Sequence, residues 1–240
     1  MKKIAWLLAA TMLFTLSCNK TDSNGKKEDG KQDATEGPVT IDGKFEDWAN
    51  LNGVVSARNS SESLWEAVKE LRVFAQGDYI YYYIRFDKET LKEFLDAKDV
   101  LPARVNLNTD GEFSSGYPNY FLQAYDFIIE MSLGNGAGGW GSAENSTLYQ
   151  RINDDWSELL GENSGLTFGA GSGYEFELVV DRSLFNDAVA KSAVPMPLGN
   201  TFQTSMRFYE TSSTGKWEEL SNMPNAPGGY GNLLDITFVK

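Results

Sequence analysis

Five aromatic side chains are the residues best suited to bind a ligand. Tyr117, Tyr120, Trp140 and Tyr230 lie in long, strand-poor segments, and Trp217 lies beside a turn. Flat aromatic rings can cover the C–H-rich faces of pyranose sugars, while neighbouring amides and carboxylates hydrogen-bond to the hydroxyls. Trp140 lies in GNGAGGWGSAEN, where its ring is either folded back as a lid or displayed for a ligand. Trp217 follows a predicted hairpin turn and precedes Glu218 and Glu219. Trp65 and Trp156 are weaker candidates, because their segments are compatible with amphipathic helices.

The residue types that are missing exclude several kinds of catalysis. The chain has no histidine, and Cys18 is its one cysteine. Ser-His-Asp and Cys-His nucleophilic sites, the usual zinc sites and haem ligation by histidine are therefore excluded. A glycosidase needs two carboxylates across a cleft, but no spacing among the 34 acidic residues selects a pair. We expect a protein without catalytic activity; an enzyme would show a deep acidic cleft.

The segment Asn106-Leu107-Asn108-Thr109-Asp110-Gly111 matches the first six positions of a calcium-binding loop, with oxygen-bearing side chains at alternate positions and glycine at the sixth. An EF-hand would need glutamate at position twelve, where this chain has Tyr117, so an EF-hand is excluded. Two alternatives stay open. One is a structural calcium ion held by Asn108, Asp110 and Asp126, and the other is an Asx-rich turn that ends a strand. No other cofactor is expected.

The segments that must position these residues are mostly β-strands. A hairpin is predicted where a Gly-containing turn, Gln76-Gly77-Asp78, separates two apolar arms. The expected strands are Val39–Ile41, Leu71–Ala75, Tyr79–Phe86, Ala103–Leu107, Ala124–Leu133, Tyr174–Val180, Phe202–Tyr209 and Leu234–Val239. Helices are predicted at Lys88–Lys98 and Arg182–Lys191, with a weaker one at Ser63–Glu70. This pattern predicts an all-β fold, an antiparallel, jelly-roll-like β-sandwich with long loops and one or two short helices.

The N-terminus has the features of a secretory signal. Lys2 and Lys3 precede the apolar run Ile4–Leu16, which at about 13 residues is too short to remain as a membrane span. Thr15-Leu16-Ser17-Cys18 resembles the lipobox of bacterial lipoproteins, although Thr15 and Leu16 stand in the reverse of the usual arrangement. That resemblance implies cleavage before Cys18 and acylation of its thiol and new N-terminus, including palmitate-type chains. An ordinary secreted protein is the alternative.

The rest of the chain divides into a tether and one domain. Residues 1–17 would be the signal peptide, 18–37 a disordered tether lacking large apolar residues, and 38–240 the β-sandwich domain. Without its signal the chain keeps 19 basic and 34 acidic side chains, a net charge of −15. Such a surface repels nucleic acid and anionic headgroups, so nucleic acid is not an expected partner and the membrane contact must come from the lipid.

Ile41-Asp42-Gly43-Lys44-Phe45-Glu46-Asp47-Trp48 resembles the I-D-G-x-x-x-D-W start of family 9 carbohydrate-binding-module-like (DOMON-like) β-sandwiches. Similar pieces follow in the family's order, including Gly173-Tyr174-Glu175-Phe176-Glu177, which is similar to its Gly-Tyr-x-x-Glu strand. In this motif we expect Trp48 to be a core anchor whose N–H meets a backbone acceptor, and Asp42 to be a turn residue. The Trp pair that clamps a terminal sugar in the family cannot be carried over, because Phe94 is the one aromatic residue between Asp87 and Arg104.

The leading hypothesis is a non-catalytic lipoprotein of the outer membrane that binds a glycan (an oligo- or polysaccharide) through its loop aromatics. The alternative is an accessory or structural envelope lipoprotein that contacts another protein and binds no sugar. The two differ in whether Trp140, Trp217 and the loop tyrosines share one exposed face.

Overall fold

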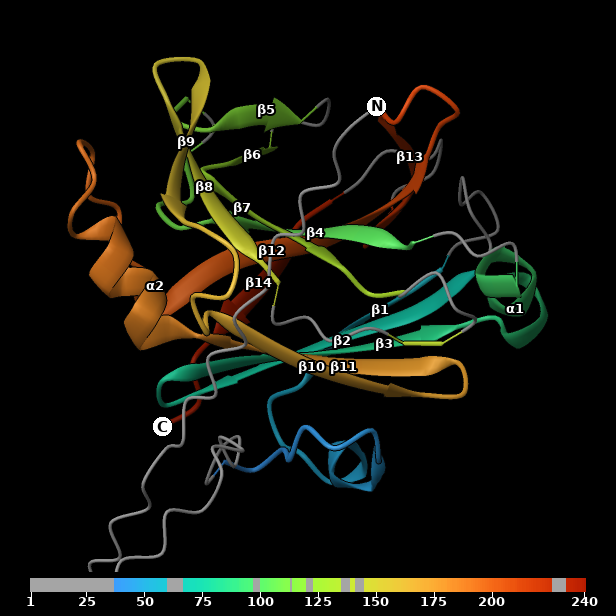
Figure 1. Cartoon of the computed structure of the whole chain (residues 1–240). Coiled ribbons are helices and arrows are strands. Elements are labelled where there is room, and N and C mark those ends of the chain that lie inside the picture. Colours follow the sequence, from blue (N-terminus) through green and yellow to red (C-terminus); the bar gives the residue numbers. More distant parts are fainter. Residues whose placement is uncertain are drawn as a thin grey trace, which may run out of the picture. The chain divides into compact units, whose positions relative to one another are not determined.

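The computed structural model describes residues 37–59, 67–96, 100–112, 114–119, 123–134, 139–140, 145–225 and 232–240. Within them, two antiparallel sheets face each other as a sandwich (Figure 1). Sheet A is hydrogen-bonded in the order β1 (Val55–Arg58), β2 (Val68–Gln76), β3 (Tyr79–Phe86), β11 (Glu175–Asp181) and β10 (Thr167–Ser172). The predicted all-β sandwich is confirmed.

Sheet B has seven strands. Its order is β13 (Trp217–Met223), β12 (Thr201–Thr211), β4 (Pro102–Asn108), β7 (Phe127–Ser132), β8 (Thr147–Ile152) and β9 (Asp155–Leu160), with β14 (Leu234–Thr237) also paired to β12. A separate hairpin joins β5 (Tyr117–Asn119) to β6 (Gln123–Tyr125). Figure 1 shows this hairpin on the side of sheet B that faces away from sheet A.

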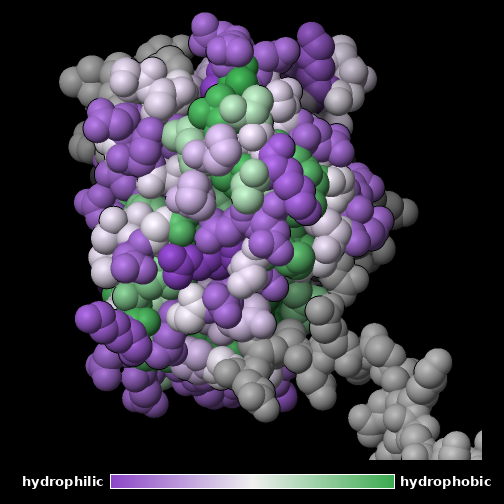
Figure 2. Space-filling model, turned by 90° about the vertical axis from the view of Figure 1, so that its left-hand side faces the viewer, coloured by the Kyte–Doolittle hydropathy of each residue, from purple (hydrophilic) through white to green (hydrophobic). Residues whose placement is uncertain are grey.

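Two α-helices and a 3-10 turn complete the described structure: α1 (Lys88–Asp96), α2 (Arg182–Val189) and η1 (Glu46–Ala49). Asp181 caps α2, since its side chain accepts a hydrogen bond from the Leu184 amide at 2.9 Å. Figure 2 looks onto the side that carries α2, where hydrophilic residues cover most of the surface between smaller apolar areas. No described helix has the length and apolarity needed to cross a bilayer.

The main core lies between the sheets because apolar residues alternate along the strands. In β4, Ala103, Val105 and Leu107 point into the core, whereas the residues between them point to the opposite face. Phe86 of sheet A meets Phe208 of sheet B edge-to-face, with ring centroids 5.6 Å apart. Removing each large apolar side chain from water contributes roughly 1.5–3 kcal/mol. The core between the two sheets, which contains many such side chains, is therefore the main stabilising feature of the fold.

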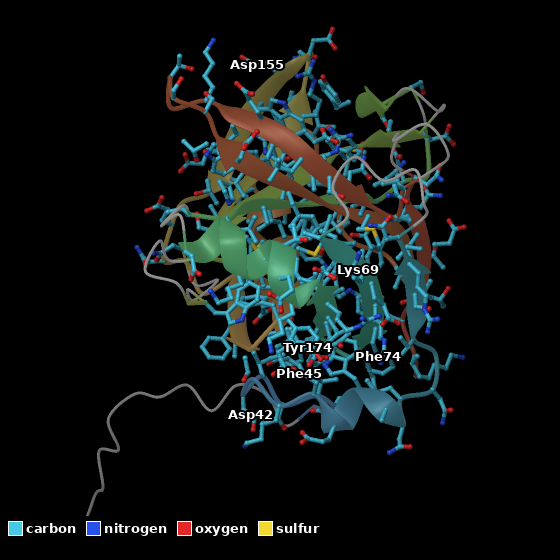
Figure 3. The ribbon with its side chains drawn as sticks, turned by 90° about the vertical axis from the view of Figure 1, so that its right-hand side faces the viewer. Asp42, Phe45, Lys69, Phe74, Asp155 and Tyr174 are labelled. Atoms are coloured by element: carbon cyan, nitrogen blue, oxygen red, sulfur yellow. The ribbon has the colours of Figure 1, made fainter. Side chains whose placement is uncertain are left out.

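A second apolar cluster covers the outer face of sheet A. Val39, Ile41 and Trp48 of the N-terminal segment pack there on Tyr81 and Tyr83 of β3. Figure 3 shows Phe45 of this segment and Phe74 of β2 at the same end of the molecule, while Asp155 lies at the opposite end. Since β3 is buried on both faces, its sequence YIYYYIRF lacks a clean alternation. Val39–Ile41 does not form a strand, so that predicted strand is wrong.

Two motifs that are far apart in the sequence meet at this cluster. Glu177 of β11 accepts hydrogen bonds from the backbone amides of Asp42 and Gly43, both at 2.8 Å, and from the Trp48 indole at 3.2 Å. Trp48 is thus buried as expected, but its acceptor is a carboxylate and not a backbone carbonyl. The Asp42 side chain accepts from the Lys44 amide at 2.9 Å, which is the predicted turn contact.

Other predicted elements differ in detail. Ala124–Leu133 is not one strand, because β6 and β7 separate at Asp126. A weaker helix is predicted at 63–70, but residues 68–70 belong to strand β2. The hairpin around Gly77 is confirmed, with Gly77 at φ +59°, a conformation that favours glycine. The N-terminal signal, Cys18 and the tether up to residue 36 lie outside the described residues.

Candidate functional site

The outer face of sheet B carries a row of aromatic and arginine side chains. Strand alternation directs Arg104 of β4 and Arg207 and Tyr209 of β12 away from the core. The β12–β13 hairpin brings Trp217 onto the same face, opposite Thr211. Its turn is closed by hydrogen bonds between Ser212 and Lys216, as the sequence predicted.

One group at the β13 edge, which we call the Trp217 platform, consists of Arg104, Tyr209 and Trp217. The Trp217 and Tyr209 ring centroids are 5.6 Å apart. The Arg104 guanidinium carbon lies 4.8 Å from the Tyr209 centroid and 5.4 Å from that of Trp217. Glu130 of β7 holds Arg104 through a 2.7 Å hydrogen bond from Nε. The guanidinium is therefore fixed against both rings.

A second group, the Trp156 platform, lies at the other edge of sheet B and consists of Tyr117, Arg151 and Trp156. The Arg151 guanidinium carbon is 5.2 Å from the Tyr117 centroid and 5.6 Å from that of Trp156. The two rings are 6.1 Å apart. Tyr117 is 39% exposed, and Arg151 pairs at 3.5 Å with Asp154, whose side chain is 99% exposed. An ion pair this exposed holds a side chain only weakly.

Two side chains fill the space between the platforms. Tyr125 stacks on Trp156 with centroids 6.1 Å apart, and the Arg207 guanidinium lies 5.3 Å from the Tyr125 centroid. Arg207 also donates to Glu219 at 3.1 Å. Burial raises the pKa of Tyr125 to about 12, so its hydroxyl stays protonated at neutral pH. We call the two platforms with Tyr125 and Arg207 the sheet B strip.

The chemistry of the sheet B strip suits polyhydroxylated molecules. Trp156 and Trp217 are half-buried and Tyr117 is exposed, so these three rings offer flat apolar surface, whereas Tyr125 and Tyr209 are buried and support them. The guanidiniums offer N–H donors. Glu130 and Glu219 place acceptor oxygens beside those donors. A sugar hydroxyl needs both a donor and an acceptor, and each of these arginine–glutamate pairs supplies them side by side.

The structure brings together two of the five predicted binding residues. Trp217 and Tyr117 both belong to the sheet B strip. Trp140 does not: its ring packs on Phe86 and Phe176, with centroids 5.4 and 5.1 Å away, and lies against Gly171. Of the two alternatives for Trp140, the structure thus supports the lid, and Trp140 shares no face with Trp217. Tyr120 and Tyr230 lie outside the described residues.

Sequence reasoning underrated Trp156, which is on strand β9 and not on a helix. A usable signal was present, because Asn153-Asp154 separates two arms with β-forming residues. Both turn residues have positive φ, 50° and 66°, as type I′ hairpin turns require. Arg104, Arg151 and Arg207 were also missed, since nothing local distinguishes them from other surface arginines.

The residues considered for calcium serve as turn acceptors. Asn108 Oδ1 accepts from the Gly111 amide at 2.7 Å, and Asp110 Oδ1 accepts from the Glu112 amide at 2.8 Å. Asp126 is buried and accepts from the Thr109 amide at 2.9 Å. Burial and the nearby Asp110 raise the pKa of Asp126. These contacts form the predicted Asx-rich turn, and calcium binding stays a prediction.

The sequence matches no family model. It also has no significant match among curated proteins.

Proposed function

We propose that this protein is a lipid-anchored, non-catalytic component of the cell envelope, on the outer membrane, that binds a glycan through the sheet B strip. The anchor rests on the signal-like N-terminus and the lipobox-like position of Cys18. The ligand class rests on one structural observation: accessible aromatic rings lie against arginine guanidiniums on the outer side of sheet B. The family resemblance agrees with this proposal, and its two motifs contact each other at Glu177.

Replacing Trp217 with alanine is expected to abolish most glycan retention, because the change removes one of the two indole surfaces of the sheet B strip. Loss of an aromatic stacking surface typically costs roughly 1–3 kcal/mol, or about five- to 150-fold in affinity. Native affinity electrophoresis of the purified full chain would measure this in gels containing xylan, glucomannan, β-1,3-glucan, galactan or starch.

The matched control is Tyr174→Ala. Tyr174 is 38% exposed, close to the value for Tyr117, but it lies at the β10–β11 turn of sheet A. We expect retention of this variant to equal that of the unchanged protein. If none of the polysaccharides retards the unchanged protein, glycan binding is rejected.

One observation favours the second candidate, an accessory lipoprotein that contacts another envelope protein. Trp140 lies apart from Trp217 and is used in packing, so the loop aromatics do not all converge. Trp, Tyr and Arg are also the residues that dominate protein–protein interfaces. Under this alternative, Trp217→Ala would release a co-purifying envelope protein while no polysaccharide retards the chain.

A further inference from the structure

We infer that the sheet B strip recognises the interior of an uncharged polysaccharide chain, which crosses the strands and touches both platforms at once. This inference rests on the proposed function and specifies its ligand. It differs from the clamping of a terminal sugar, for which one platform would be enough.

The two platforms have the same composition. Each contains one tryptophan, one tyrosine and one arginine, and each guanidinium carbon lies near both rings. The distances are 4.8 and 5.4 Å in the Trp217 platform and 5.2 and 5.6 Å in the Trp156 platform. A polysaccharide presents the same sugar face repeatedly along its length. Two sites of like chemistry therefore suit a repeating polymer better than a single small molecule.

The two tryptophans are too far apart for one sugar ring to reach both. Trp217 is on β13 and Trp156 on β9, the two ends of the strand order of sheet B. Five inter-strand steps of about 4.8 Å span about 24 Å on a flat sheet, and less where the sheet curls. Arg207 lies over the buried Tyr125 ring in the interval. The groups that the interval offers to a ligand are thus Arg104 and Arg207 with their glutamate partners, and not a further ring.

The charges of the strip favour an uncharged polymer. Each of its three arginines has a carboxylate partner: Arg104 pairs with Glu130, Arg207 with Glu219 and Arg151 with Asp154. The strip therefore has no surplus positive charge to attract a uronate or sulfate. The net charge of −13 for the whole chain further disfavours a polyanion.

The test uses the full chain with the same five neutral polysaccharides, and with oligosaccharides of two, four, six and eight residues prepared from each. Isothermal titration is expected to show affinity rising at least tenfold from the disaccharide to the octasaccharide, because linked sites reinforce each other. Trp156→Ala and Trp217→Ala should each weaken octasaccharide binding at least tenfold and flatten the length dependence. Borohydride reduction of the chain ends should leave binding unchanged.

Tyr174→Ala is again the control. Tyr117→Ala is the second variant of the Trp156 platform, because its ring is the most exposed one of the strip. The inference would be overturned if Trp156→Ala and Tyr117→Ala both kept octasaccharide binding within twofold while Trp217→Ala lost it. That result would show that only the Trp217 platform binds the glycan. Loss of binding after end reduction, or preference for polygalacturonate over the neutral polymers, would also overturn it. In each of these cases glycan binding itself would stand. Failure of every polysaccharide to bind the unchanged protein would instead reject the proposed function.

Discussion

Replacing Glu177 with alanine is expected to lower the free energy of unfolding by about 3 kcal/mol, of which roughly 1–3 kcal/mol comes from the buried Trp48 N–H and the rest from two part-buried amides. The two carboxylate oxygens of Glu177 accept from the Asp42 and Gly43 amides and from the Trp48 indole. Alanine would leave these three groups without their acceptor beneath the N-terminal segment. Chemical denaturation would measure the loss, with Glu46→Ala, an exposed carboxylate of η1, as the control.

The same side chain should make stability depend on pH. Burial raises the pKa of Glu177 from 4.5 to about 7, although its three hydrogen bonds lower the pKa in part. Between these values the folded chain binds a proton that the unfolded chain has lost. The contribution of Glu177 to the free energy of unfolding is therefore fully present below about pH 4.5 and is lost as the pH rises towards 7. At roughly 1.4 kcal/mol per pKa unit, the loss is about 3 kcal/mol.

Glu177→Gln should remove this part of the pH dependence, because glutamine does not titrate. Its amide can still accept from Asp42 and Gly43, but its NH₂ group would face the Trp48 N–H. Unfolding curves between pH 4.5 and 8 would show the difference between the two proteins. If Glu177→Gln kept the full slope, another carboxylate would be responsible and the assignment to Glu177 would be wrong.

The layered fold could be predicted because its signals are local. The β2–β3 hairpin follows from a turn glycine between apolar arms, and α2 follows from an apolar stripe after a capping aspartate. The N-terminal segment was harder. Val39 and Ile41 are apolar enough for a strand, but they are buried by packing on the outer face of sheet A and not by strand pairing. Sequence patterns report burial, not the partner that provides it.

The sheet B strip could be predicted only in part, because its residues come from separate strands. Trp217 was found because it follows a predicted hairpin turn, and Tyr117 because it lies in a long segment with few strand signals. Arg104 and Tyr209 become neighbours through the pairing of β4 with β12, in which Arg207 lies opposite Arg104. That register depends on the whole sheet, and no window of sequence contains it. Asp126 likewise ends β6 through contacts with Thr109, which belongs to another segment.

Gly171→Ala is the second change with a large expected effect, and it tests whether Trp140 is a lid. A Cβ at Gly171 would clash with Trp140 Cγ and would lie 2.7 Å from Phe176 Cδ2, well inside contact distance. Either the indole must leave its place on the core or the strand must shift. Overpacking of this kind costs about 1–3 kcal/mol in the free energy of unfolding. Gly199→Ala is the matched control, since the nearest atom to its added Cβ is Thr201 O at 3.8 Å.

Trp140→Ala should itself cost about 3 kcal/mol, since the ring packs on Phe86 and Phe176. The double variant distinguishes a lid from a displayed ring. With the indole gone, the methyl group added at position 171 loses its nearest clash, so Gly171→Ala should cost about 1 kcal/mol less in the Trp140→Ala background than alone. Glycan retention should stay unchanged in all three variants, because Trp140 lies apart from the sheet B strip. Additive costs together with lost retention would instead show that Trp140 faces the ligand, and the lid assignment would fail.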